Sequence, residues 1–88
     1  MMIEVRKIAE GEIVEKGIRD WPVWEKEVSR FPADYDEEEW CYFLEGEVVI
    51  ETEIGNFNIV PGDFVVFRSG LSCTWDIRKP VRKNYNFI

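Results

Sequence analysis

Histidine is absent from the 88-residue sequence. Histidine is the commonest metal ligand and the usual activator of cysteine nucleophiles, so its absence excludes a Cys–His dyad and argues against a conventional metal centre. There are only two cysteines, Cys41 and Cys73, which do not imply a disulfide framework. No apolar run approaches the roughly 20 residues that a membrane-spanning helix needs, and no N-terminal segment resembles an export signal. We therefore expect a cytoplasmic protein with reduced thiols that makes no contact with membranes.

Positive charge is also scarce. Eleven basic residues face 18 acidic ones, for a net charge of −7. Nucleic acids and anionic membranes attract proteins with a positive field, so neither is expected as a partner. The same argument excludes the small five-stranded barrels that bind nucleic acids, because those need a basic face.

The length predicts a single domain, residues 1–88. A chain this short buries only about 60–65% of its unfolded surface, so its core is small. We therefore expect a homodimer, in which a second copy covers apolar edges of the small barrel. Four tryptophans, three tyrosines and six phenylalanines must fill a core, an interface or a ligand cavity.

Alternation of apolar and polar residues predicts an all-β fold made of about eight short strands. On the strand that starts at Glu39, one face carries Glu39, Cys41 and Phe43, and the other face is also apolar, so both faces should be covered. Residues 64–67 form a continuous apolar run that is typical of a buried strand. Gly11 and Gly17 weaken a helix in residues 9–20, where a strand or a loop is equally compatible, and residues 24–31 are compatible with a strand or a short helical turn.

Glycine and proline mark the expected turns, and Pro80 is expected to break the last long strand in two. The predicted turns lie at Glu45-Gly46, Gly55-Asn56, Pro61-Gly62 and Ser69-Gly70.

Two of these segments together resemble the two-part signature of the cupin superfamily. Glu39 and Gly46 have the spacing of the glutamate and glycine in the first cupin motif. Gly62 and Gly70 match the frame of the second motif, in which Arg68 occupies the usual proline position and Cys73 the usual histidine position. The resemblance covers residues 31–77 and implies a small antiparallel cupin barrel, which is a double-stranded β-helix or jelly roll.

Four further segments resemble a branch of very small single-domain cupins that are predicted enzymes and are related to the ureidoglycine aminohydrolase cupin domain. They are Trp21-Pro22-Val23-Trp24-Glu25, Cys41-Tyr42, Cys73-x-Trp75 and Val81-Arg82-Lys83-x-Tyr85. The resemblance implies a cavity inside the barrel and leaves the reaction open.

Glu39 and Cys73 are the candidate catalytic residues. A carboxylate is rarely buried without a partner, so Glu39 is interpreted either as an acid/base or metal ligand, or as half of a structural ion pair with Arg68, Arg82 or Lys83. Cys73 is either a reactive thiolate or an inert buried thiol. A divalent metal is not expected because the imidazole ligands are missing; if one binds, Glu39 and Cys73 are its candidate ligands.

The remaining candidates would bind a small-molecule ligand through aromatic stacking or charge. They are Tyr35, Trp21, Trp24, Cys41, Phe43, Trp75, Arg82 and Lys83. The leading functional hypothesis is an enzyme that acts on a small polar metabolite in the barrel cavity without a conventional metal. The alternatives are a non-catalytic ligand-binding module and a structural module whose interior is filled by side chains.

Overall fold

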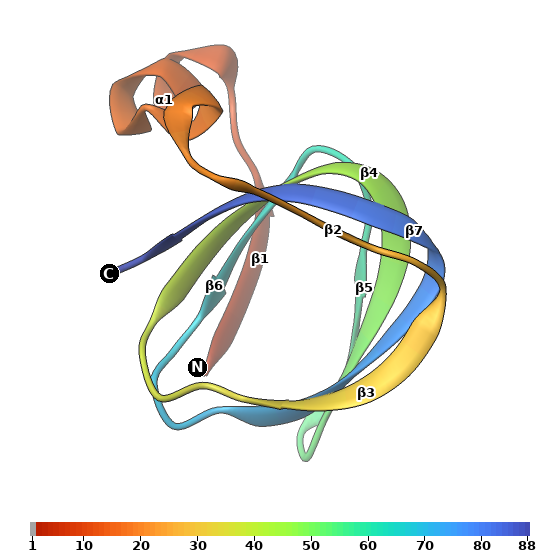
Figure 1. Ribbon diagram of the computed structural model, residues 1–88. Coiled ribbons are helices and arrows are strands. Elements are labelled where there is room, and N and C mark those ends of the chain that lie inside the picture. Colours follow the sequence, from red (N-terminus) through yellow and green to blue (C-terminus); the bar gives the residue numbers. More distant parts are fainter. Residues whose placement is uncertain (1) are drawn as a thin grey trace.

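A computed structural model describes residues 2–88 as one continuous seven-stranded antiparallel sheet that folds over into a barrel of two layers (Figure 1). The predicted all-β antiparallel barrel is therefore confirmed. One layer contains β1, β6 and β2, and the other contains β5 and β3; β4 and β7 run through both. The bounds are β1 Ile3–Lys7, β2 Val23–Lys26, β3 Ser29–Asp34, β4 Glu39–Thr52, β5 Gly55–Ile59, β6 Asp63–Phe67 and β7 Ser72–Phe87.

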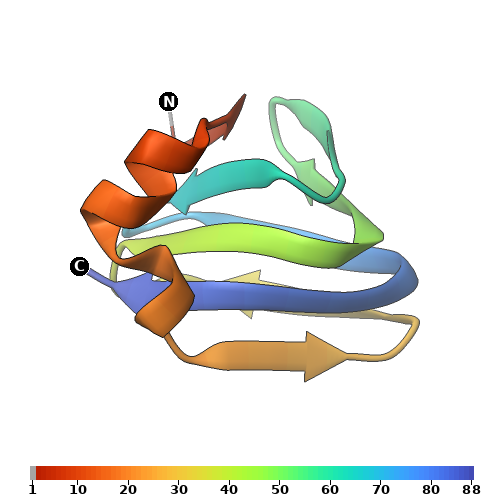
Figure 2. The same cartoon turned by 90° about the horizontal axis from the view of Figure 1, so that it is seen from above.

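The two long strands bend together at one corner. The first half of β4 pairs with the second half of β7, from Glu39↔Phe87 to Phe43↔Lys83, and the remaining halves pair from Val48↔Ile77 onward. Gly46 lies between these stretches with φ 98°, and a Cβ there would stand 2.3 Å from the carbonyl oxygen of Pro80. Only glycine fits this backbone approach. Figure 2 shows β7 curving from one layer into the other.

This corner corrects two sequence predictions. Glu45-Gly46 does not reverse the chain and Pro80 does not end a strand, because both lie inside continuous strands that only bend. The three register shifts between residues 43 and 48 of β4 absorb the change in direction.

The other turns are mostly as predicted, since turns precede Asp63 and Leu71 at Pro61-Gly62 and Ser69-Gly70. The predicted Gly55-Asn56 hairpin turn is two residues too late: Glu53-Ile54 form the turn, and Gly55 already pairs with Thr52 at φ 134°. The Thr52 hydroxyl donates to the carbonyl oxygen of Gly55 at 2.7 Å and closes the turn.

The ambiguous N-terminal segment forms helix α1, Glu10–Lys16, and a 3-10 turn η1, Ile18–Asp20, rather than a strand. Both pack outside the barrel, where buried Ile13 and Ile18 contact Phe64 and Val66 of β6 (Figure 2). This cover explains why both faces of the β4 and β6 strands are apolar. Among residues 2–88, no helix is long and apolar enough to cross a membrane.

The barrel interior forms the larger apolar cluster, and its buried members come mostly from alternate positions of five strands, as the period-two pattern predicts. Phe43, Val48, Ile50 and Phe67 are at most 2% exposed. Trp24, Tyr35 and Tyr85 pack at its edge and are only partly buried. The interior therefore opens on the side where these aromatic rings lie.

Candidate functional site

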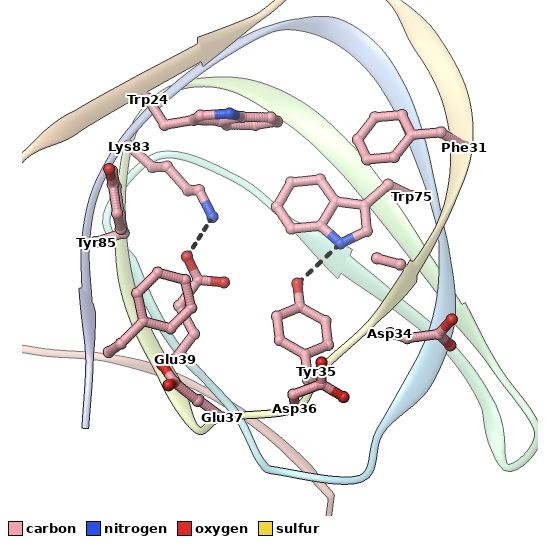
Figure 3. A pocket seen from close by; sticks show the side chains of 12 residues that line it. Trp24, Phe31, Asp34, Tyr35, Asp36, Glu37, Glu39, Trp75, Lys83 and Tyr85 are labelled. Carbon is pink, nitrogen blue, oxygen red and sulfur yellow. Dashed lines mark hydrogen bonds and ion pairs between the residues drawn. The ribbon is translucent and has the colours of Figure 1, made fainter.

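A cavity of about 570 Å³ opens at this end of the barrel, between β2, β3, the residues that precede β4, and the last residues of β7 (Figure 3). Its volume is in the range that holds small metabolites. Glu39, Lys83 and Tyr35 provide polar groups toward its inner end. Aromatic rings line its walls: Trp24, Phe31, Trp75, Tyr85 and Phe87.

The innermost polar pair is Lys83 with Glu39. The Lys83 Nζ lies 3.2 Å from the Glu39 Oε2 and donates a second hydrogen bond to the Cys41 Sγ at 3.1 Å. Lys83 is 4% exposed and Glu39 6%. The neighbouring strands β4 and β7 place them together, because Glu39, Cys41 and Lys83 all face the interior. Of the three partners that the sequence left open for Glu39, the structure selects Lys83.

Aromatic rings surround the same ammonium group. The Lys83 Nζ lies 4.8 Å from the ring centre of Trp75 and 5.0 Å from that of Trp24, with three more rings within 6.0 Å. Burial lowers the pKa of Lys83, but its interactions with Cys41 and Glu39 outweigh this effect, so the pKa ends above its usual value. Lys83 is therefore an ammonium and not a free-amine nucleophile.

Tyr35 contributes a neutral hydroxyl. It follows β3, and its ring stacks on Phe67 with centres 4.8 Å apart. The hydroxyl accepts a hydrogen bond from the Trp75 Nε1 at 3.1 Å. Burial, and then the negative charge of Glu39, raise the pKa of Tyr35 far above its usual range. At physiological pH its hydroxyl keeps its proton and can donate it in a hydrogen bond.

Three exposed acidic residues, Asp34, Asp36 and Glu37, lie among the lining residues on one side of the cavity mouth. The Ser72 hydroxyl donates to the Asp34 Oδ1 at 2.7 Å. Asp34 turns its carboxylate away from the cavity toward Ser72 (Figure 3), so three carboxylates, those of Glu39, Asp36 and Glu37, lie at the cavity against one ammonium, and the field inside it is negative. An anionic ligand is disfavoured at the mouth.

The structure brings five of the sequence-predicted residues together around this cavity: Glu39, Tyr35, Trp24, Trp75 and Lys83. Two others lie directly behind its lining. Cys41 is fully buried and reaches the Lys83 ammonium, and the Phe43 ring centre lies 6.0 Å from the Lys83 Nζ.

The other three predicted residues do not line the cavity either. Cys73 is buried in the interior cluster, and burial raises its pKa to about 11, so it is a thiol rather than a thiolate. Trp21 packs in the outer cluster, and its carbonyl oxygen accepts a hydrogen bond from Asn84 at 3.1 Å. Arg82 is exposed and lies 3.5 Å from Glu25 and 3.7 Å from Glu45.

Sequence reasoning missed several lining residues, of which Phe31, Tyr85, Asp36 and Glu37 matter most. Phe31 and Tyr85 were detectable from alternation, since Phe31, Ala33 and Tyr35 share one face and Lys83 and Tyr85 another. Asp36 and Glu37 carry no such signal, because a loop has no period and their acidic run reads as a solvated segment.

Cupin barrels typically hold a metal, but the donor set here does not fit one. No group of three or more cysteine, aspartate or glutamate side chains in the described part of the chain is close enough to share an ion. Glu39, which occupies the motif position of a ligand, has an ammonium group 3.2 Å away, and an ammonium repels a cation. Chemistry at this cavity is therefore derived from its side chains.

Comparison with known proteins places these features in a family. A family model described as the EutQ-like cupin domain matches residues 14–85. A DUF861 family protein from Thermotoga maritima is 44% identical; the match covers 98% of this chain and 99% of that one, with a TM-score of 0.94. Among curated proteins, no significant match is found.

More distant solved structures share the fold. A DUF861 family protein from Pseudomonas syringae pv. tomato is 28% identical, and the match covers 75% of this chain and 29% of that one, with a TM-score of 0.68. The Clostridium difficile EutQ protein is 15% identical over 74% of this chain and 52% of that one, also with a TM-score of 0.68. At 15% identity, the second likeness concerns the fold alone.

Proposed function

The chain belongs to the EutQ-like cupin domain family, and from this premise we propose that it binds a small polar metabolite in the barrel cavity and acts on it through Glu39. One observation carries the proposal: a single cavity combines aromatic walls with a buried pair of opposite charges at its inner end. Such pairs are costly to desolvate, and they mark functional sites more often than other positions.

The proposed role of each residue depends on its position in the cavity. The aromatic walls stack on the ligand and exclude water, which strengthens polar contacts at the inner end. The Glu39 carboxylate exchanges a proton with the ligand, and the Lys83 ammonium beside it favours negative charge that develops on a ligand oxygen. We assign this second polar role to Lys83 rather than to Cys73, because Cys73 does not line the cavity.

Thermal unfolding in the presence of small polar metabolites tests the binding part. A ligand that binds only the folded state raises the melting temperature. We expect such a rise for the wild type and for the control Glu53→Gln, which alters an exposed hairpin residue. The double variant Glu39→Gln/Lys83→Met removes both charges together and is expected to lose the rise. An equal rise in the double variant would contradict the proposal.

A non-catalytic binding module is the second candidate. Glu39 is already engaged by Lys83 at 3.2 Å, an arrangement that suits holding a ligand as well as exchanging protons. Incubating the stabilising compounds with the protein and following them by NMR separates the two candidates, since an enzyme converts these compounds and a binding module leaves them intact. The relation to ureidoglycine aminohydrolases expected from the sequence stays a prediction.

A further inference from the structure

Two hydrogen-bond donors at the inner end of the cavity are unused. A lysine ammonium has three N–H donors. Two of those on Lys83 go to Glu39 and Cys41, and the third has no acceptor among residues 2–88. The Tyr35 hydroxyl accepts from Trp75, and its own proton likewise has no acceptor in the described chain. Both side chains reach into the cavity (Figure 3).

An acceptor lies beside these donors. Glu39 is a lining residue, and its carboxylate has more lone pairs than the bond from Lys83 occupies. Tyr35 and Lys83 line the same cavity as Glu39, so the three groups face one space. A ligand that satisfies all of them needs an oxygen acceptor and an N–H donor side by side.

The charges around the cavity restrict which chemical group of a ligand can bind at its inner end. A carboxylate would supply the oxygen but would meet Glu39 at the inner end and the carboxylates of Asp36 and Glu37 at the mouth. An amidinium would satisfy Glu39 but would turn N–H donors toward the donors of Lys83 and Tyr35. A neutral group with a carbonyl oxygen and an adjacent N–H avoids both conflicts.

We propose that the inner end of the cavity recognises a neutral primary carboxamide group, with its oxygen toward Lys83 and Tyr35 and its N–H toward Glu39. This inference rests on the proposed function, because it names the class of ligand that the same cavity takes. The aromatic walls of Trp24 and Trp75 favour a carboxamide attached to a flat apolar body.

Three compounds of nearly identical shape test the proposal. Benzamide is neutral with an acceptor and a donor, benzoate is an anion with acceptors only, and benzamidine is a cation with donors only. Titration is followed by the indole N–H signals in NMR spectra. Trp24 and Trp75 line the cavity while Trp21 and Trp40 pack outside it, so the latter two are internal controls.

We expect benzamide to shift the signals of Trp24 and Trp75 alone and to bind at least about tenfold more tightly than benzoate and benzamidine. A tenfold ratio corresponds to about one well-placed hydrogen bond. Equal or tighter binding of benzoate or benzamidine would overturn the carboxamide assignment and leave the cavity function standing. If none of the three moves either signal at tens of millimolar, both proposals fail.

Tyr35→Phe is the matched variant, since it removes one donor and keeps the ring on Phe67. It should weaken benzamide binding about fivefold to tenfold. The control Tyr42→Phe, on the outer face of β4, should leave binding unchanged. Unchanged benzamide affinity in a folded Tyr35→Phe protein would remove Tyr35 from the recognition of the oxygen.

Discussion

Two lysines on opposite sides of the barrel wall have similar neighbours. Outside, Lys16 of α1 lies 5.1 Å from the ring centre of Trp40 and 3.4 Å from the Glu12 carboxylate. Inside, Lys83 lies 4.8 Å from the ring centre of Trp75 and 3.2 Å from Glu39. The exposed fractions of their side chains differ: 21% for Lys16 and 5% for Lys83.

This difference in exposure means that similar contacts contribute differently to stability on the outer and inner sides of the barrel wall. Water screens the outer pair, which i,i+4 spacing on a helix produces routinely. The inner pair has lost its hydration and depends on its partners. A surface arrangement of this kind needs no function to explain it, whereas the inner arrangement requires the barrel to tolerate two buried charges.

Removing one inner charge should have the largest effect. Lys83→Met leaves Glu39 buried without its partner and should lower the free energy of unfolding by about 3–5 kcal/mol. Urea denaturation measures this value. The double variant Glu39→Gln/Lys83→Met should recover most of the loss, because neither charge then remains buried alone. If the double variant is as unstable as the single one, packing and not charge explains the loss.

Two tryptophan substitutions compare the inner and outer sides of the barrel wall, with smaller expected losses of stability than Lys83→Met. Trp75→Phe removes ring contacts and the N–H donor to Tyr35 at 3.1 Å, and we expect a loss of about 2 kcal/mol. Trp40→Phe removes a 2.7 Å hydrogen bond to Glu38 on the outer face, where water can replace it, so its loss should be well under 1 kcal/mol. Similar losses for both would contradict the proposed contrast.

Alkaline pH should lower the stability of the protein through groups buried inside the barrel. Burial raises the pKa of Cys41 from 9.0 to about 12, so above pH 9 the unfolded chain loses a proton that the folded chain keeps. Stability therefore falls as the pH rises from 9 toward 12, by at most about 1.4 kcal/mol per pH unit for this thiol.

The raised pKa of Lys83 acts in the same direction above pH 10.5, since the folded chain holds its proton longer than the unfolded one. Urea midpoints measured between pH 8 and 11 should fall less steeply for Cys41→Ala than for the wild type. Parallel curves would show that Cys41 does not titrate differently in the two states.

The outer lysine should matter least. Lys16→Met keeps the apolar stem over Trp40 and loses only a screened pair, so the urea midpoint should stay within experimental error at both low and high salt. A salt-dependent loss comparable to that of Lys83→Met would show that the two sides do not differ.

Much of this architecture was predictable because the strand period of two is strong here. The buried run of β6, the alternation of β4 and β7 and the turn at Pro61-Gly62 follow directly from apolar spacing and turn chemistry. The bends at Gly46 and Pro80 could not be predicted, because a glycine or proline in one strand indicates a turn unless the partner strand is known to bend beside it.

The site was predictable in part for the same reason. Glu39 stands out because a carboxylate at an inward position of an apolar strand is unusual. Its partner stayed open, because three basic residues were in range and only the register of β4 against β7 selects Lys83. Cys73 faces inward as expected, but alternation gives the face of a strand and not the depth along the barrel, so its distance from the cavity could not be deduced.

The pairing of β7 has a consequence for synthesis on the ribosome. Among residues 2–88, strands β2 and β3 have β7 as their only sheet partner, and β7 also pairs with both halves of β4. A nascent chain that ends before residue 72 lacks β7, so neither β2 nor β3 can yet pair with the sheet. The strands that carry aromatic residues of the cavity therefore stay unpaired until the 16 residues of β7 have emerged, and unpaired strand edges of this kind are prone to aggregate.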